Sequence, residues 1–61
     1  MKLEDWMRQK NLTDQAMSKL IDTSRTAVTM YRNGQRIPKP DIARRIFEVT
    51  NKKVTPSDFI L

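Results

Sequence analysis

TDQAMSKLIDTSRTAVTMYRN, from Thr13 to Asn33, contains two short helical patterns separated by a break at Asp22-Thr23. An α-helix turns by about 100° per residue, so apolar residues of one face recur every three or four positions. In the second pattern this spacing places on one arc the apolar residues Ala27, Val28 and Tyr31. The opposite arc holds Arg25, Thr26, Thr29, Met30 and Arg32. The stretch therefore predicts two consecutive helices, the second of which buries a narrow edge and exposes threonine and arginine.

Capping residues predict where these two helices begin and end. Thr13 and Ser24 each precede a helical pattern, and their hydroxyls can accept a hydrogen bond from a first-turn backbone N–H. Gly34, the only glycine of the chain, follows the second pattern, where a left-handed residue ends a helix. We therefore expect helices at about residues 13–21 and 24–32. The first should bury an apolar stripe made of Ala16, Met17, Leu20 and Ile21.

The segments before and after this pair are also predicted to be helical. Lys2 to Lys10 is amphipathic, with Trp6 on its apolar side and Asn11 as a left-handed stop. On the other side, Gln35 to Lys39 forms a basic connector, and Ile37 is expected to fasten it to the core.

Two more helix starts follow the connector. Pro40-Asp41 opens the most clearly amphipathic segment of the chain, because proline is favoured in a first helical turn. Thr55-Pro56 repeats this signal and predicts a short last helix that carries Phe59. No segment alternates apolar and polar residues as a half-buried strand does. The sequence predicts an all-α fold, with residues 1–61 as a single domain of about five short helices.

Positive charge is concentrated in the second half of the chain. Residues 1–23 contain four basic and four acidic side chains, whereas residues 24–53 contain eight basic and two acidic ones. A one-sided basic surface is typical of a protein that binds a polyanion. A solvated basic face that serves solubility is the alternative, and charge alone does not separate the two.

Composition argues against several other functions. The chain has no histidine and no cysteine, which removes the usual acid-base, nucleophilic and metal-binding side chains. We therefore expect no catalytic residue, no metal site, no cofactor and no small-molecule ligand. There is no apolar run of membrane-spanning length, and the first residues do not form a signal peptide. The expected protein is soluble and cytoplasmic.

The pattern LTDQAMSKLIDTSRTAVTMYRNGQRIPKPDIARRIFEV resembles the helix-turn-helix domain of the Cro and phage-repressor family of transcriptional regulators. The resemblance runs from Leu3 to about Phe59 and includes the Asn-Gly exit, the proline-containing connector and the closing Thr-Pro-x-Asp-Phe. It implies that the second helix of the pair enters the major groove of DNA. The buried positions that it implies are Met17, Ile21, Val28 and Tyr31.

The resemblance also implies which residues touch DNA. Base-reading positions fall on Ser24, Arg25, Thr26, Thr29 and Met30. Phosphate-contacting positions fall on Gln15, Arg32, Asn33, Gln35, Arg36 and Lys39. Among the base-reading positions, Arg25 is the best candidate for two hydrogen bonds to guanine O6 and N7.

Three residues depart from the family pattern. Ser18 stands where alanine is usual, and its hydroxyl can bond back to a helix carbonyl. Asp22 stands where glycine is usual, in a turn that needs left-handed backbone. Asp14 replaces a glutamine that commonly contacts phosphate, and a carboxylate there is expected to repel DNA. For that reason the phosphate contact of this helix is assigned to Gln15.

The sequence thus predicts a sequence-specific regulator that binds double-stranded DNA, of the phage Cro-like repressor kind. One such unit reads few base pairs, so a two-fold dimer on palindromic half-sites is expected. The apolar tail offers the dimer contact, formed by Phe59, Ile60 and Leu61, although Phe59 closing the core is the plain alternative. A protein-interaction module that uses the same exposed helix is the competing function, and sequence-independent RNA or DNA binding is the third.

Overall fold

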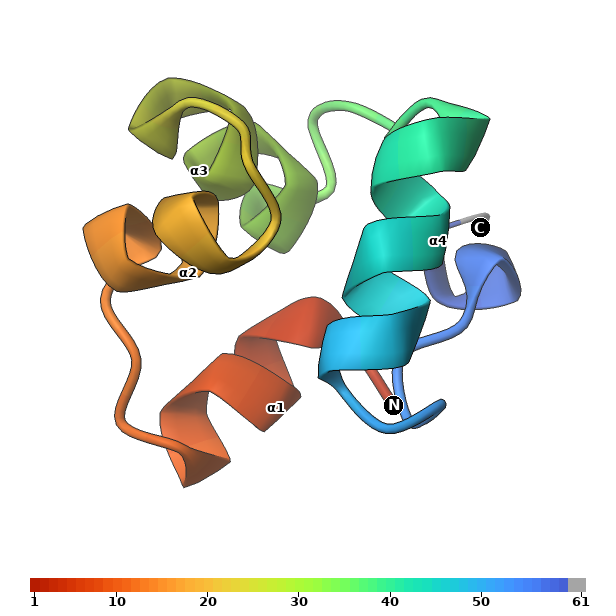
Figure 1. Ribbon diagram of the computed structural model, residues 1–61, viewed down its shortest axis with the longest axis horizontal. Coiled ribbons are helices and arrows are strands. Elements are labelled where there is room, and N and C mark those ends of the chain that lie inside the picture. Colours follow the sequence, from red (N-terminus) through yellow and green to blue (C-terminus); the bar gives the residue numbers. More distant parts are fainter. Residues whose placement is uncertain (60–61) are drawn as a thin grey trace.

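Helices are the only regular structure within residues 1–59, the part of the chain that this computed structural model describes (Figure 1). Four are α-helical and the last is a short 3-10 helix. In chain order they are α1 (Leu3–Gln9), α2 (Asp14–Leu20), α3 (Arg25–Asn33), α4 (Pro40–Val49) and η1 (Pro56–Phe59). The all-α prediction is confirmed. In the view of Figure 1, α2 and α3 lie together on one side, α4 lies on the other, and α1 crosses below.

The predicted helix ends are found within one residue of the expected positions. The Thr13 hydroxyl accepts a hydrogen bond from the Ala16 N–H, and the Ser24 hydroxyl accepts one from the Ala27 N–H, each at 3.1 Å. At the other end of α3, Gly34 has φ +78°, in the left-handed region where glycine has no steric penalty. Local capping interactions therefore determine where α2 and α3 begin and where α3 ends.

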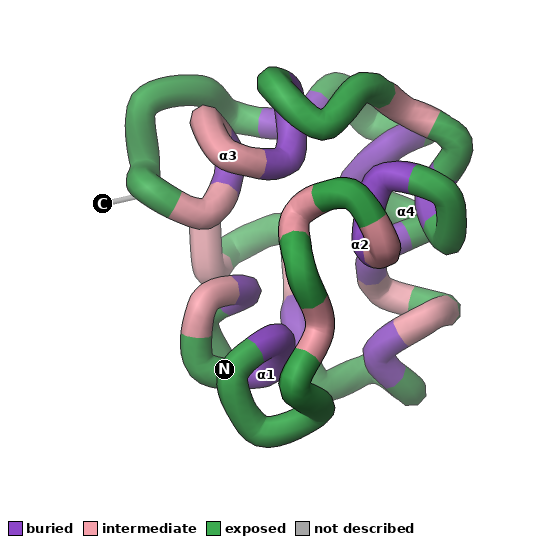
Figure 2. Tube along the Cα trace, turned by 90° about the vertical axis from the view of Figure 1, so that its left-hand side faces the viewer, coloured by how far each residue is buried: buried purple, intermediate pink, exposed green. Residues whose placement is uncertain are grey.

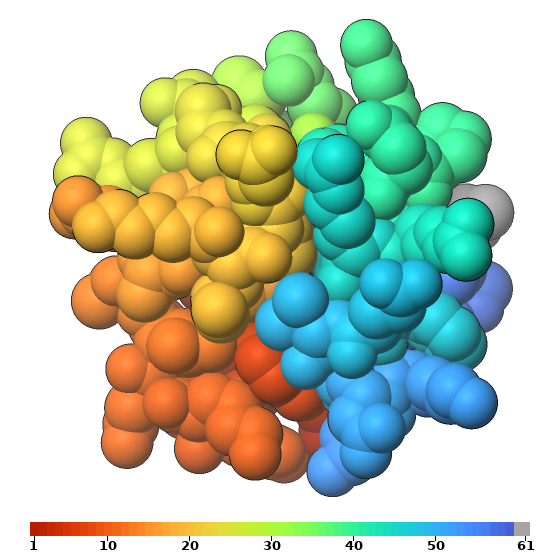
Figure 3. All heavy atoms as spheres, viewed as in Figure 1, coloured from red at the N-terminus to blue at the C-terminus, as the bar shows by residue number. Residues whose placement is uncertain are grey.

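One shared core holds the helices together. Its fully buried side chains include Met17, Ile21, Val28, Ile46 and Val54. Trp6 is only 6% exposed, as expected for a residue on the apolar side of an amphipathic helix. In Figure 2 buried and exposed stretches alternate along the helices, as expected when each helix turns one face inward. The space-filling view shows that side chains fill the space between the ribbons (Figure 3).

The predicted stripe of the first helix of the pair is only half correct. Met17 and Ile21 are buried, but Ala16 is half-buried and Leu20 is 51% exposed. The inner side of α2 is formed by Met17 and Ser18, with the C-cap residue Ile21. Successive residues of a helix are about 100° apart, so Ala16 and Leu20, each one position before a buried residue, lie at the edge of this inner side or outside it.

The expected role of Ile37 is wrong. Its side chain is 63% exposed, and the neighbouring Pro38 is buried in its place. Proline has no backbone N–H, so burying it leaves no donor without a partner. Successive side chains of a non-helical, extended segment point to opposite sides. Burial of Pro38 therefore turns Ile37 outward.

A threonine stabilises the turn between α4 and η1. The buried Thr50 hydroxyl donates to the Ile46 carbonyl at 2.7 Å and accepts from the Val54 N–H at 3.1 Å. This turn contains two left-handed residues, Asn51 and Lys52.

The predicted last helix is a single 3-10 turn. Phe59, at its end, is half-buried against the core. Ile60 and Leu61, the other two residues assigned to the dimer contact, lie outside the described residues.

Candidate nucleic-acid interface

One backbone hydrogen bond closes the turn between α2 and α3, and a side-chain hydrogen bond lies next to it within α2. The Thr23 N–H donates to the Ser18 carbonyl at 2.9 Å, and the Ser18 hydroxyl donates to the Gln15 carbonyl at 2.6 Å. Asp22 has φ +55°. It therefore adopts the left-handed conformation that was expected for this position, where the family usually has glycine. Of these two departures from the family pattern, Ser18 is thus accommodated within α2 and Asp22 within the turn.

The inner and outer faces of α3 separate as its periodicity predicts. Ala27, Val28 and Tyr31 are buried. The five residues expected to read bases lie on the remaining surface, where Ser24, Arg25 and Thr26 are exposed and Thr29 and Met30 are half-buried. Arg25, the first residue of α3, stands at the end of the helix that enters a groove first in helix-turn-helix docking.

Asp14 is the centre of a polar network between α2 and α3. Its Oδ2 atom accepts a hydrogen bond from the Thr29 hydroxyl at 2.6 Å and another from Arg32 Nη2 at 3.2 Å. Arg32 Nε lies 3.0 Å from Oδ1, although its N–H is not directed at that oxygen. The Thr29 oxygen is also 3.1 Å from the Arg25 carbonyl. A hydroxyl has one proton, and the closer, charged carboxylate is the stronger acceptor.

These partners keep Asp14 ionised. The hydrogen bond from Thr29 lowers the pKa of the Asp14 carboxyl below its ordinary value, and Arg32 and the more distant Arg25 act in the same direction. Partial burial opposes them by disfavouring the charged form. The network thus places at the first residue of α2 a carboxylate that is hydrogen-bonded to Thr29 and paired with Arg32.

The residues expected to contact phosphates lie at the start of α2, at the end of α3 and on the connector that follows α3. Gln15 at the start of α2 is exposed, and so are Asn33, Gln35, Arg36 and Lys39 on the connector side. Arg32, the remaining member of the expected set, faces Asp14 and lies 3.9 Å from Glu4 through Nη1. The structure therefore brings five of these six side chains to solvent and engages the sixth internally.

Ion pairing divides the six arginines of the chain into two groups. Within residues 1–59, carboxylates pair with Arg8, Arg32, Arg44 and Arg45. Arg25 and Arg36 form no ion pair with any described residue. Of the three arginines expected to contact bases or phosphates, Arg25 and Arg36 therefore form no ion pair within residues 1–59, whereas Arg32 is paired with Asp14.

The Asp14 network is the feature of this surface that sequence reasoning missed. Asp14 was expected to repel DNA as a free carboxylate, whereas two side chains of α3 bind it. A partial signal was present in the sequence, since Thr29 and Arg32 are three residues apart and share a helix face. The position of α2 relative to that face was not available from the sequence.

Comparison with known protein families matches residues 3–56 to the family described as Helix-turn-helix. No curated protein and no solved structure matches the chain. No helix of the described residues has the length and apolar character needed to cross a membrane.

Proposed function

This chain belongs to the helix-turn-helix family of the Cro and repressor type, whose members are DNA-binding regulators of transcription, and we propose that it acts as a Cro-like repressor on palindromic operators. In this proposal α3 enters the major groove, which accepts one α-helix. The observation that supports this proposal is that Arg25 and Arg36 form no ion pair within residues 1–59, whereas the other four arginines are paired with carboxylates there.

Arg25 is proposed to read a guanine. A guanidinium can donate two hydrogen bonds to guanine O6 and N7, and this pairing discriminates between bases. Ser24 and Thr26 flank it on the exposed start of α3, and each offers a hydroxyl to a polar base edge. Thr29 and Met30, one turn further, add apolar contact, with the threonine methyl suited to the thymine C5 methyl.

Phosphate contacts are proposed to fix the register of α3 without reading sequence. The exposed side chains that support this role are Gln15, Asn33, Gln35, Arg36 and Lys39. Arg32 joins them only where its ion pair with Asp14 opens. Because phosphate contacts release counterions, binding should weaken steeply as salt is added.

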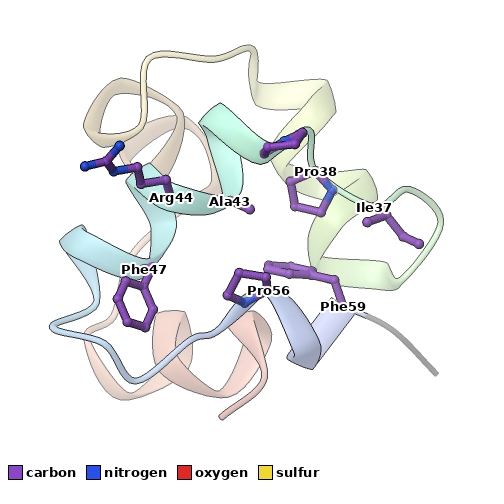
Figure 4. A pocket seen from close by; sticks show the side chains of 8 residues that line it. Ile37, Pro38, Ala43, Arg44, Phe47, Pro56 and Phe59 are labelled. Carbon is purple, nitrogen blue, oxygen red and sulfur yellow. The ribbon is translucent and has the colours of Figure 1, made fainter.

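A second copy of this chain is the proposed partner on DNA. An apolar groove of about 480 Å³ lies between the connector, α4 and η1, and Ile37, Phe47 and Phe59 are among its lining residues (Figure 4). The guanidinium of Arg44 points away from it in that view. Phe59, one of the three residues that the sequence assigns to the dimer contact, lines this groove; the other two, Ile60 and Leu61, lie outside the described residues.

Selection of binding sites from random duplex DNA tests this function. A regulator of this kind should enrich a two-fold symmetric sequence with half-site centres about one helical turn apart. Failure to enrich any sequence would contradict the proposal. In that case binding of a protein partner through the same exposed helix would be the function to pursue.

A further inference from the structure

Arg32 lies on the same side of α3 as Arg25, yet its surroundings are acidic. Its Nη2 atom donates a hydrogen bond to Asp14 Oδ2 at 3.2 Å, and its Nε atom lies 3.0 Å from Oδ1 without a hydrogen bond. On its other edge, Nη1 is 3.9 Å from Glu4 Oε1. Its side chain is 30% exposed, and that of Asp14 is 21% exposed. Both edges of the guanidinium that could meet an oxyanion therefore already face one.

A carboxylate and a DNA phosphate place the same demands on an arginine. Each presents two anionic oxygens that match the planar fork of the guanidinium. A phosphate that approached Arg32 would have to displace Asp14, and the displaced carboxylate would be left beside the incoming negative charge. The Thr29 hydroxyl, 2.6 Å from Asp14 Oδ2, further holds the carboxylate in this position.

We infer that Asp14 is a negative determinant of DNA affinity: it occupies Arg32 in place of a backbone phosphate and so reduces the binding of this chain to DNA of any sequence. The inference rests on the proposed function and identifies which of its cations reach the DNA backbone. Asp14 is a positioning residue, since it acts through Arg32 and not through contact with a base.

The decisive comparison is between Asp14→Asn and Asp22→Asn. Both variants remove one negative charge near α2, at its first residue and just after its last turn, but Asp22 is 92% exposed and within residues 1–59 approaches only Arg45, at 3.9 Å. Binding of a fluorescent duplex of arbitrary sequence is measured by anisotropy over a range of salt concentrations. Each phosphate contact contributes about 0.9 to the slope of log K against log salt. Asp14→Asn should steepen the slope by about that amount, whereas Asp22→Asn should leave it unchanged.

Arg32→Gln supplies the second measurement. In the otherwise unchanged chain it should leave the salt slope as it is, because Arg32 contacts no phosphate there. In the Asp14→Asn background it should return the steepened slope to its original value. Thermal unfolding of each variant, followed by circular dichroism, verifies that the comparison is made between folded proteins, and Arg32→Gln alone still tests the inference if Asp14→Asn is unfolded.

Several results would overturn the inference. A slope that falls by about one phosphate contact in Arg32→Gln alone would mean that Arg32 already binds the backbone. Equal slopes for Asp14→Asn and Asp22→Asn would mean that Asp14 affects DNA binding through its charge alone and not through Arg32. If the unaltered chain bound no duplex at all, the proposed function would fail together with the inference, whereas binding with the wrong slopes would remove the inference alone.

Discussion

Arg25 and Arg32 are seven residues apart on α3 and therefore lie on nearly the same side of the helix. Only Arg32 is within reach of a carboxylate that holds it, Asp14 at 3.0 Å. Arg25 lowers the pKa of Asp14 from a greater distance but forms no ion pair with any residue in 1–59. Asp14, at the start of α2, thus binds one of these two arginines and leaves the other without an ion pair within residues 1–59.

Arg25→Ala should weaken binding to the selected operator by about 1–3 kcal/mol, the discrimination typical of a bidentate contact to guanine. It should also relax the preference at one base pair, because no other side chain would read that position. Titration against operator variants that differ at single base pairs measures both effects. Arg44→Ala is the matched control, since Arg44 is 80% exposed on α4 and pairs with Glu48. An equal loss on every sequence would show instead that Arg25 contacts phosphate.

Arg36→Ala should behave differently, although the same charge is removed. Arg36 is exposed on the connector after α3 and forms no ion pair with a described residue. Its loss should reduce affinity on all duplexes and lower the slope of log K against log salt by about 1. Measuring the slope on operator and unrelated DNA tests this. Unchanged slopes on both would exclude Arg36 from the interface.

At the scale of the helix, Gly34 ends α3 where the connector begins. A Cβ atom built there would meet nothing within 4 Å, but φ is +78°. Gly34→Ala should therefore lower the free energy of unfolding by about 1–2 kcal/mol through backbone strain alone. Gly34→Asn should cost less, because asparagine tolerates left-handed backbone better than most residues. Urea unfolding of both variants measures the difference, and an alanine variant as stable as the original would disprove the strain.

Helix ends were predictable because their causes are local. Thr13, Ser24 and Gly34 act on backbone groups no more than four residues away, so their roles follow from the sequence. The pairing of Asp14 with Arg32 spans 18 residues and depends on how α2 packs on α3. In the connector, Pro38 is buried in place of Ile37. This segment is irregular, so helical periodicity does not predict which of the two adjacent side chains points to the core.

For the molecule as a whole, two carboxylates link stability to pH. The pKa of Asp14 is lowered mainly by its hydrogen bond from Thr29, and that of Asp58 mainly by the Thr55 backbone N–H, with the terminal ammonium group next. A lowered folded-state pKa contributes stability above the unfolded value, about 3.9, and this contribution is lost as pH falls through the folded pKa.

The melting temperature should therefore change little from neutral pH to about 5 and fall as the solution becomes more acidic than about pH 4. Asp14→Asn should make this acid decline shallower, because the group that must be protonated is gone. Asp22→Asn, which removes an exposed carboxylate, is the control and should leave the decline as it is. Circular dichroism melts at a series of pH values provide the measurement. An acid decline that is identical in all three proteins would mean that Asp14 does not contribute to it.

The proposed dimer would require an apolar contact surface outside α3. Ile37 projects from the connector, 63% exposed, and lines the groove bounded by α4 and η1. In the proposed dimer, a second copy would cover this isoleucine and remove its apolar surface from water. Burying such a side chain contributes about 1.5–3 kcal/mol, and a two-fold interface contains it twice.

Ile37→Ser should therefore weaken self-association at least about tenfold, since a tenfold change corresponds to about 1.4 kcal/mol. Sedimentation equilibrium gives the association constant directly. On DNA, the variant should lose affinity for a duplex with two half-sites and keep its affinity for a single half-site, because α3 is untouched. Leu20→Ser is the matched control: Leu20 is also an exposed apolar residue, at 51%, but it lies on α2 outside the groove. If both substitutions left association unchanged, two copies would meet through another surface, and the geometry of the half-sites would have to be derived from there.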